Sequence, residues 1–338
     1  MHIDHDVPLM RLNTFGVAAT ARHYIRADSA DTIRDALAWA ENRGLRSLVL
    51  GGGSNILFME PVEALVLQIA LAGRTVLNMG DGRHLVTVAA GERWDDLVRW
   101  AVGQGYGGIE NLILIPGTVG AAPVQNIGAY GVEFGDVCHS VTALHRRTGT
   151  MREFSAEECH FGYRDSFFKQ HPEEWIVTGI SLVLDEHAPL RAEYGVLRQK
   201  LAALATKQPC CVDVAEAVEA IRKAKLPSPE VLGSAGSFFK NPVVAATLYQ
   251  NLRERYPALS GYEQEDGAVK LSAAWLLDSA GWKGKRAGNV GCYPLQPLVL
   301  VNYGGATGEE ILRFSETIRD DIAQRFGVLL EREAVVYP

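Results

Sequence analysis

Two glycine-rich stretches are the first candidates for chemistry in this sequence. Residues 112–131 run Leu-Ile-Leu-Ile-Pro-Gly-Thr-Val-Gly-Ala-Ala-Pro-Val-Gln-Asn-Ile-Gly-Ala-Tyr-Gly and contain no charged side chain. Residues 51–55, Gly-Gly-Gly-Ser-Asn, directly follow a short apolar run. Glycine lets the backbone approach a ligand closely, and turn N–H groups can form anion sites. The pattern suits a long, mostly apolar ligand that carries a phosphate, although each stretch alone is equally typical of tight turns.

Composition excludes several other classes of protein. The chain has 338 residues, 47% of them hydrophobic, and a formal net charge of −7. A chain of this length and apolar content forms two or three domains, and an acidic chain without a basic tract is a poor nucleic-acid binder. The first residues lack the basic segment and apolar core of a signal peptide, and no run approaches the ~18 apolar residues of a membrane span.

The five cysteines are odd in number and show no C-x-x-C spacing. This argues against a disulfide framework and a zinc site, so we expect no metal. Together these features predict a cytoplasmic protein with reduced thiols, no nucleic-acid partner and no membrane insertion.

Hydrophobic periodicity and end signals predict the elements that must position the glycine-rich stretches. Strands are expected at 23–26, 47–50, 62–69, 84–90, 137–146, 151–154, 175–184, 298–302 and 328–336. Helices are expected from the caps at 28–31 to about 42, and at 94–103, 196–207, 214–223, 272–279 and 308–326. The stretch 226–229, Leu-Pro-Ser-Pro, is typical of a linker, and a domain boundary is expected near it.

Several motifs in one order resemble the UDP-N-acetylenolpyruvoylglucosamine reductase (MurB) family. They are Asn-Thr-Phe at 13–15, Leu-Gly-Gly-Gly-Ser-Asn-Ile at 50–56, Ile-Pro-Gly-Thr-Val-Gly at 115–120, Gln-Asn-Ile-Gly-Ala-Tyr-Gly at 125–131, Tyr-Arg-Asp-Ser-Phe-Phe-Lys at 163–169, Lys-Leu-Pro at 225–227, Gly-Ser-Phe-Phe-Lys-Asn-Pro at 236–242, Ala-Gly at 287–288 and Glu-Arg-Glu at 331–333. Each motif is weak by itself, but the ordered combination spans almost the whole chain and is specific.

The resemblance implies an α+β fold. A two-domain FAD-binding fold of the PCMH type (vanillyl-alcohol-oxidase-like) is expected over 1–70 and 71–225, with a lid segment near 186–210. A C-terminal α/β substrate-binding domain is expected over 226–338. FAD would be held non-covalently, because no cysteine or histidine lies within 51–55 or 115–131. The implied reaction reduces a UDP-sugar enolpyruvyl ether with NADPH for bacterial peptidoglycan precursor synthesis, and we expect a monomer.

The resemblance also implies roles for individual residues. Ser237 matches the proton donor, Glu333 the catalytic carboxyl, and Arg164 the arginine that binds and polarises the enolpyruvyl carboxylate. Judged by spacing alone, Ser237 is better explained as a turn serine and Glu333 as a solvated acid. Arg164 is as well explained by an ion pair, with Asp165 or another acid.

The remaining expected contacts fall into two sets. FAD contacts are expected at Gly51, Gly52, Gly53, Ser54, Asn55, Pro116, Gly117, Gly120, Ala121, Gln125, Asn126, Gly128 and Arg222. Substrate contacts are expected at Tyr130, Tyr163, Tyr194, Lys225, Asn241, Tyr262 and Gln296. Ordinary explanations stay open here, such as Lys225 as an exposed lysine at a helix end and the tyrosines as packed aromatics.

The sequence departs from the family pattern at a few positions. Ala121 and Ala122 stand where many members have Gly or Ser, and Val335 stands where some members have a basic residue. Glu193-Tyr194-Gly195 resembles the tyrosine-loop (type I) branch of the family. Two other functions are kept as alternatives: a related flavin oxidase, and a flavin- or UDP-sugar-binding module without chemistry.

Overall fold

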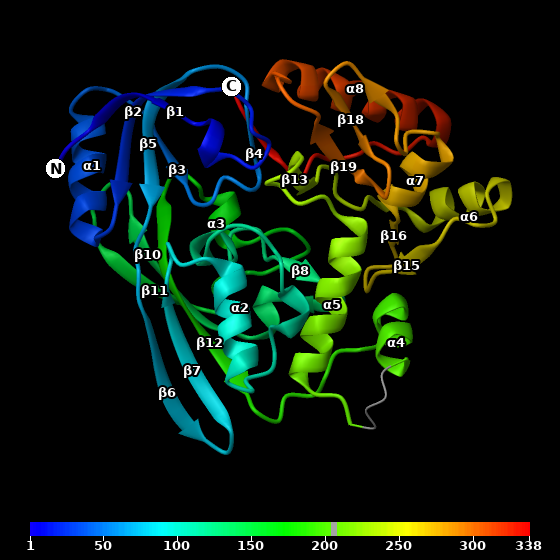
Figure 1. Ribbon diagram of the computed structural model, residues 1–338, viewed down its shortest axis with the longest axis horizontal. Helices are drawn as coiled ribbons and strands as arrows, with labels where there is room; N and C mark the ends of the chain where they lie inside the picture. The colour runs from blue at the N-terminus through cyan, green and yellow to red at the C-terminus, as the bar shows by residue number, and fades with distance from the viewer. Residues whose placement is uncertain (204–207) are drawn as a thin grey trace. The chain divides into compact units, whose positions relative to one another are not determined.

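The computed structural model describes residues 1–203 and 208–338, and in it the chain divides into two units. Unit 1 comprises Met1–Val7, Ala21–Gly52 and Val62–Lys223, and unit 2 comprises Pro8–Thr20, Gly53–Pro61 and Ala224–Pro338. Figure 1 colours the chain by residue number and shows that each unit contains segments far apart in sequence. The predicted three-part division at 1–70, 71–225 and 226–338 stays a prediction.

A four-stranded sheet with one covering helix forms the first part of unit 1. Its strand order is β1 (Asp4–Pro8), β2 (Thr20–Ala27), β5 (Val62–Ile69) and β3 (Ser47–Leu50), with β5 parallel to both β2 and β3. Helix α1 (Ala30–Glu41) begins where the Ser29 hydroxyl accepts a hydrogen bond from Thr32 N. Its Ile33, Ala36 and Ala40 are buried at helical spacing in one core with Leu65 and Leu67 of β5. The near-continuous apolar run of β5 is typical of a parallel strand buried on both faces.

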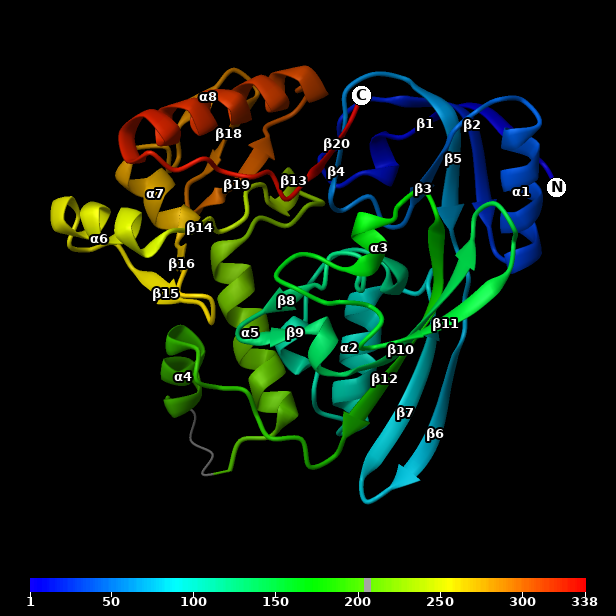
Figure 2. The same ribbon diagram turned by 180° about the vertical axis from the view of Figure 1, so that it is seen from behind.

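An antiparallel sheet forms the second part of unit 1. Its strand order is β11 (Met151–Ser155), β10 (Cys138–His145), β12 (Trp175–Asp185), β7 (Arg83–Ala89) and β6 (Arg74–Gly80). Helices α2 (Trp94–Gly103) and α5 (Cys211–Lys225) share one core with β7 and β12. Figures 1 and 2, which view the molecule from opposite sides, show both helices on the same face of this sheet. The sheet and these helices flank the glycine-rich stretch.

Shorter elements complete unit 1. They are η2 (Glu110–Leu112), η3 (Val119–Ala121), β8 (Gly128–Ala129), β9 (Val132–Glu133), η4 (Phe134–Asp136), α3 (Phe167–Gln170) and α4 (Gly195–Ala202).

Unit 2 is a second α/β structure with its own core. Its main sheet has the order β13 (Gly233–Ser237), β19 (Gln296–Asn302), β18 (Val290–Tyr293) and β17 (Arg286–Ala287), and all its pairings are antiparallel. Helices α7 (Ala273–Ser279) and α8 (Gly308–Phe326) pack against this sheet (Figure 1). Helix α8 begins with a capping box of Thr307 and Glu310 and ends at Gly327 with φ 66°, which are ordinary start and stop signals.

The remaining elements of unit 2 form two small sheets, one helix and one short turn. They are β14 (Val243–Val244), β16 (Val269–Leu271) and β15 (Gly261–Glu263), the parallel pair β20 (Val335–Tyr337) and β4 (Ile56–Phe58), α6 (Ala246–Arg255) and η1 (Met10–Leu12).

Most predicted elements are present, including the hairpin that turns at 147–149 between β10 and β11. The strand predicted over 328–336 is wrong except at its end, where β20 spans Val335–Tyr337. Its backbone pairs in two short pieces instead of one ladder: Arg332 forms an isolated antiparallel bridge with Phe239, and Val335–Tyr337 pairs with β4. Leu330 O accepts from the Arg319 Nε side chain instead of a strand. The helix predicted over 196–207 corresponds to α4, and 204–207 lies outside the described residues. Within the described residues, no helix combines the length and apolar character needed to cross a membrane.

Candidate active site

The two glycine-rich stretches meet backbone to backbone within unit 1. A Cβ atom at Gly52 would lie 2.9 Å from the Cα of Gly117, and one at Gly51 would lie 2.5 Å from Thr118 Oγ1. Only glycine permits the approach of Gly52 to Gly117, because real Cβ atoms do not come so near to backbone. The two stretches that the sequence singles out separately as ligand-binding loops are therefore neighbours in the fold, and their contact with a ligand stays a prediction.

Helix α2 and the strand before it hold the longer stretch in place. Trp94 Nε1 donates to Leu112 O at 3.1 Å, and Asp95 Oδ1 accepts from Leu114 N at 2.6 Å. Gly120 N donates to Ala90 O, and a Cβ atom at Gly120 would lie 2.6 Å from the Ala90 Cβ. The stretch is therefore a fixed loop rather than a flexible connection.

A half-buried arginine contacts this loop. Arg222 of α5 donates through Nη2 to Leu114 O at 3.2 Å. Its Nε atom is buried and has no hydrogen-bond partner among residues 1–203 and 208–338. Burial lowers the pKa of the Arg222 guanidinium, while the neighbouring Tyr130 and Asp95 oppose that shift. A buried donor without a partner is costly, so an acceptor on a bound ligand would complete the site.

Two of the predicted substrate tyrosines come together in unit 1. The rings of Tyr130 and Tyr194 pack edge to face with centroids 5.5 Å apart. Tyr130 has a φ of 51°, and burial raises the pKa of its hydroxyl. Tyr194 is exposed and immediately precedes α4.

The loop at 124–128 interlocks with the segment 162–169. Asn126 is 1% exposed, and its amide donates to Gly162 O at 3.0 Å and to Glu133 Oε2 at 2.7 Å. Its Oδ1 accepts from Gly135 N at 2.9 Å. The Ser166 hydroxyl donates to Val124 O at 2.9 Å. Two motifs that are about forty residues apart in sequence are thus one structural piece.

Arg164 is held against the same loop. It has a φ of 54°, and its guanidinium donates to Gly128 O at 2.7 Å and to Asn126 O at 3.3 Å. Gly128 allows this approach, since a Cβ atom there would lie 3.1 Å from Arg164 Nη1. The oxygens of Asp165 accept from Ser166 N and Gln170 Nε2.

Lys169 has a place in this piece that sequence reasoning missed. Its Nζ donates to Arg164 O at 2.6 Å and to Gln125 Oε1 at 3.1 Å. The Ser166 hydroxyl accepts from Lys169 N and caps the short helix α3. A Ser-x-x-Lys spacing after the arginine was the available signal, because an N-capped turn directs Lys169 back along the chain.

In unit 2, Ser237 lies at the end of β13 where the strand pairing is irregular. Ser237 pairs with Val299, and the register shifts between Ser234 and Ser237. Gly236 has a φ of 67°, so this bulge redirects the following side chain. Phe238 and Phe239 are fully buried and anchor the segment. The Ser237 hydroxyl makes no hydrogen bond within the part of the chain that the structure describes, unlike a serine that serves a turn.

The same segment holds Glu333. Glu333 N donates to Phe238 O at 2.8 Å, one residue after Ser237, and Glu333 O accepts from Asn55 Nδ2 at 3.1 Å. Lys240 continues the pairing through Glu331, with a backbone bond of 2.9 Å and an ion pair of 3.0 Å. The structure therefore brings Ser237, Asn55 and the backbone of Glu333 together within unit 2.

The other predicted residues of unit 2 are not gathered in this way. Lys225 is exposed at the end of α5, and Tyr262 is exposed on β15. Asn241 Oδ1 accepts from Ala273 N at the start of α7, which is a structural use. Gln296 has a buried Oε1 without a partner among the described residues.

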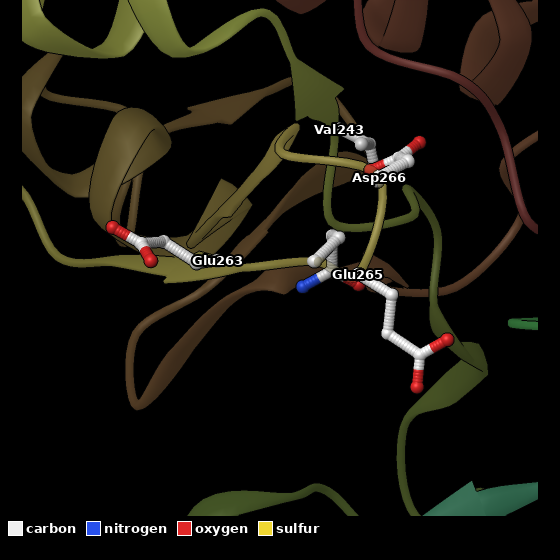
Figure 3. A pocket seen from close by; sticks show the side chains of 5 residues that line it. Val243, Glu263, Glu265 and Asp266 are labelled. Atoms are coloured by element: carbon white, nitrogen blue, oxygen red, sulfur yellow. The ribbon is translucent and has the colours of Figure 1, made fainter.

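Unit 2 also contains an open hollow of about 540 Å³ beside β15. It is lined by Val243, Glu263, Gln264, Glu265 and Asp266 (Figure 3). Figure 3 shows the carboxylates of Glu263 and Glu265 pointing in different directions. An acidic lining repels an anionic ligand, and no group of three or more potential metal ligands occurs in 1–203 or 208–338.

Comparisons with known proteins assign both parts of the chain. Residues 21–155 match the family model described as an FAD binding domain, and residues 227–337 match the C-terminal domain of UDP-N-acetylenolpyruvoylglucosamine reductase. The chain is 50% identical to the reductase of that name from Pseudomonas aeruginosa, over 100% of this chain and 99% of the relative. It is 46% identical to the one from Paraburkholderia phymatum, over 98% and 96%.

Solved structures support the fold class predicted from the sequence. The MurB structure from Thermus caldophilus superposes with a TM-score of 0.70 at 25% identity and covers 100% of both chains. A solvent-stable cholesterol oxidase superposes with a TM-score of 0.51 at 12% identity, over 98% of this chain and 87% of the oxidase. The second likeness concerns the fold alone. It agrees with the predicted PCMH-type flavin fold.

Proposed function

The chain belongs to the UDP-N-acetylenolpyruvoylglucosamine reductase family, and we propose that it carries electrons from NADPH through FAD to UDP-N-acetylglucosamine enolpyruvate. The product is UDP-N-acetylmuramate, a peptidoglycan precursor. The chemistry requires a hydride at the terminal methylene carbon and a proton at the ether-bearing carbon of the enolpyruvyl group.

The residues of unit 1 fit FAD. The close approach of Gly52 to Gly117 leaves backbone where side chains would exclude a ligand, and the buried Nε of Arg222 lacks an acceptor among the described residues. The same fixed loop carries the expected FAD contacts Pro116, Gly120, Ala121, Gln125, Asn126 and Gly128. Three more expected contacts directly follow Gly52 in the sequence and belong to unit 2: Gly53, Ser54 and Asn55. Bound there, FAD would supply hydride-transfer chemistry between NADPH and the enolpyruvyl carbon.

Arg164 is assigned to the enolpyruvyl carboxylate. A guanidinium binds a carboxylate through two parallel hydrogen bonds and stabilises the negative charge that develops next to it. Its bonds to Gly128 O and Asn126 O fix the direction of the planar group before the substrate arrives.

Ser237 and Glu333 are assigned to proton transfer. The Ser237 hydroxyl, unused within the described residues, gives its proton to the ether-bearing carbon. The carboxyl of Glu333 stabilises the enolate form of the substrate by hydrogen bonding while that proton moves. The backbone bond from Glu333 N to Phe238 O supports this pairing of roles.

The uridine diphosphate is assigned to the remaining predicted residues. Lys225, Tyr194 and Asn241 contact the nucleotide and diphosphate, and Tyr130, Tyr163, Tyr262 and Gln296 contact the rest of the substrate. The packing of Tyr130 on Tyr194 supports the first of these sets. We also infer that the chain belongs to the tyrosine-loop branch, with a lid segment near 186–210, of which 204–207 lies outside the described residues.

The location, oligomeric state and domain division complete the proposal. We infer a cytoplasmic monomer, with two FAD-binding domains over 1–70 and 71–225 and a substrate domain over 226–338. Val335 lies in β20 and is exposed, at a position that is basic in some relatives.

The observation that carries the proposal is the hydrogen-bonded pairing of the Ser237 segment with Glu333. The test is NADPH consumption by the yellow holoenzyme. Consumption should start only when the UDP-enolpyruvyl sugar is added. An oxidase would instead consume oxygen with an alcohol substrate, and a binding module would show flavin absorbance without turnover. Either of these results would refute the reductase proposal.

A further inference from the structure

The half-buried side chain of Lys169 makes two hydrogen bonds that its place in the sequence does not predict. A lysine side chain is usually solvated. The Lys169 side chain instead turns back toward Arg164, five residues earlier, and its Nζ donates to Arg164 O at 2.6 Å. The same ammonium reaches Gln125 Oε1 at 3.1 Å. It therefore joins the segment that carries Arg164 to the glycine-rich loop.

The backbone of Arg164 needs such a restraint. Its φ of 54° lies in the left-handed region, where a residue with a Cβ atom is strained and persists only when its surroundings hold it. Gly162 and Asp165 exchange two backbone hydrogen bonds of 3.1 Å around it. The Lys169 ammonium adds a charge-assisted bond to the carbonyl of the strained residue itself.

The direction of the Arg164 guanidinium depends on this backbone. From the left-handed conformation it reaches Gly128 O and Asn126 O. If Arg164 returned to an ordinary φ, its side chain would leave from a different direction and these two bonds could not both form. Asn126 restrains the other side of this turn, because its amide donates to Gly162 O.

We propose that Lys169 is a positioning residue for Arg164, which keeps the arginine in its left-handed conformation and aims its guanidinium. This inference rests on the proposed role of Arg164 toward the enolpyruvyl carboxylate. Lys169 itself need not touch the substrate. A displacement of about 1 Å in a catalytic group can slow a reaction by ~10²-fold, so the loss of this restraint should be measurable.

The test is a double-mutant cycle with Lys169→Met and Arg164→Met, read by stopped-flow flavin absorbance. Lys169→Met should slow reoxidation by the UDP-enolpyruvyl sugar by about 10–100-fold, with flavin reduction by NADPH unchanged. In the Arg164→Met background it should add almost nothing, because its effect passes through Arg164. Titration calorimetry of the sugar with oxidised holoenzyme should show the same non-additivity in binding.

The control is Lys283→Met, which makes the same change at a partly exposed lysine 3.4 Å from Asp278. It should leave both half-reactions unchanged. If Lys169→Met does not give folded protein, Lys169→Gln, which retains a shorter donor, is judged by the same criteria.

The outcomes distinguish the proposed role of Arg164 from the positioning role of Lys169. If Arg164→Met leaves reoxidation unchanged, the proposed role of Arg164 is wrong. If Arg164→Met slows it while Lys169→Met does not, only the positioning role is wrong. Independent, multiplying effects, or equal losses in both half-reactions, would likewise overturn the positioning role, since Lys169 would then act elsewhere or merely stabilise the flavin loop.

Discussion

The two parts of the candidate site differ in the balance of side-chain and backbone hydrogen bonds that hold them together. In unit 1, side chains organise the loops: Asn126, Ser166 and Lys169 all donate to groups of a neighbouring segment. In unit 2, the Ser237 and Glu333 segments pair through their backbones, as Glu333 N donates to Phe238 O and Lys240 N donates to Glu331 O. Side-chain bonds from Asn55 to Glu333 O and from Lys240 to Glu331 add to this pairing.

In unit 2, the group proposed for catalysis can be removed without loss of a structural contact among the described residues, whereas in unit 1 the proposed binding groups also hold the fold together. The Ser237 hydroxyl supports nothing in the described structure, so its removal should leave the fold intact. The side chains of unit 1 bind and support at once, so most changes there should alter both stability and function. Variants in both units test this contrast.

Ser237→Ala should have the largest effect and the least structural consequence. Reoxidation of the flavin by the UDP-enolpyruvyl sugar should slow by about 10²–10⁴-fold, the usual contribution of a positioned general acid. This is roughly 3–5 kcal/mol of barrier at about 1.36 kcal/mol per tenfold. Flavin reduction by NADPH and the melting temperature should stay at wild-type values, because the hydroxyl has no partner among the described residues. Stopped-flow absorbance measures each half-reaction separately.

Ser237→Cys is the matched control, because a thiol also offers a transferable proton. It should retain much of the activity. If Ser237→Ala slows both half-reactions alike, or neither, Ser237 is a structural residue and the proton comes from another group.

Gly52→Ala should show the coupling of binding and architecture in unit 1. The added Cβ would lie 2.9 Å from the Gly117 Cα, which is backbone and cannot rotate away. Such overpacking costs roughly 1–3 kcal/mol, or about 5- to 150-fold in affinity. We expect weaker FAD binding and a lower melting temperature together, measured by the flavin-to-protein ratio after dialysis and by thermal unfolding.

Gly103→Ala makes the same change in the same unit where a Cβ atom meets nothing within 4 Å. It should keep its flavin and its stability. A Gly52→Ala protein that melts lower but retains FAD fully would show that the contact with Gly117 is only structural.

The sequence predicts the regular elements well, and the reasons are local. Helix α8 carries its capping box and its terminal glycine in the chain itself, and β5 is visible as an apolar run. The failed strand at 328–336 has the composition of a strand, but its pieces pair with different segments: Arg332 bridges to Phe239, and Val335–Tyr337 pairs with β4. No periodicity records such partners.

The candidate site divides in the same way. Glycines at 51, 52, 117 and 120 could be singled out because their residue type is itself the signal. The bond from Lys169 to Arg164 could not, since it requires a left-handed backbone at an arginine, which its residue type does not announce. Resemblance supplied the roles of Ser237 and Glu333, while the pairing that joins their segments became visible only in the fold.

The smallest expected effect concerns Lys225, which lies two residues after Lys223 near the end of α5. Both lysines can stabilise the negative end of the helix, and Lys223 also pairs with Glu219 at 2.6 Å. Only Lys225 is assigned to the diphosphate, so Lys225→Ala should raise the KM for the UDP-sugar by about tenfold, as loss of a charged hydrogen bond of roughly 1.5 kcal/mol predicts. The KM for NADPH and the reoxidation rate at saturating sugar should not change, because a contact made equally in ground and transition states affects binding alone.

Lys223→Ala should instead affect only thermal unfolding, by less than about 1 kcal/mol. If the two variants behave alike, Lys225 serves the helix end rather than the substrate. In that case the diphosphate contacts come from unit 1, through Tyr194, and the contrast between the two units becomes sharper.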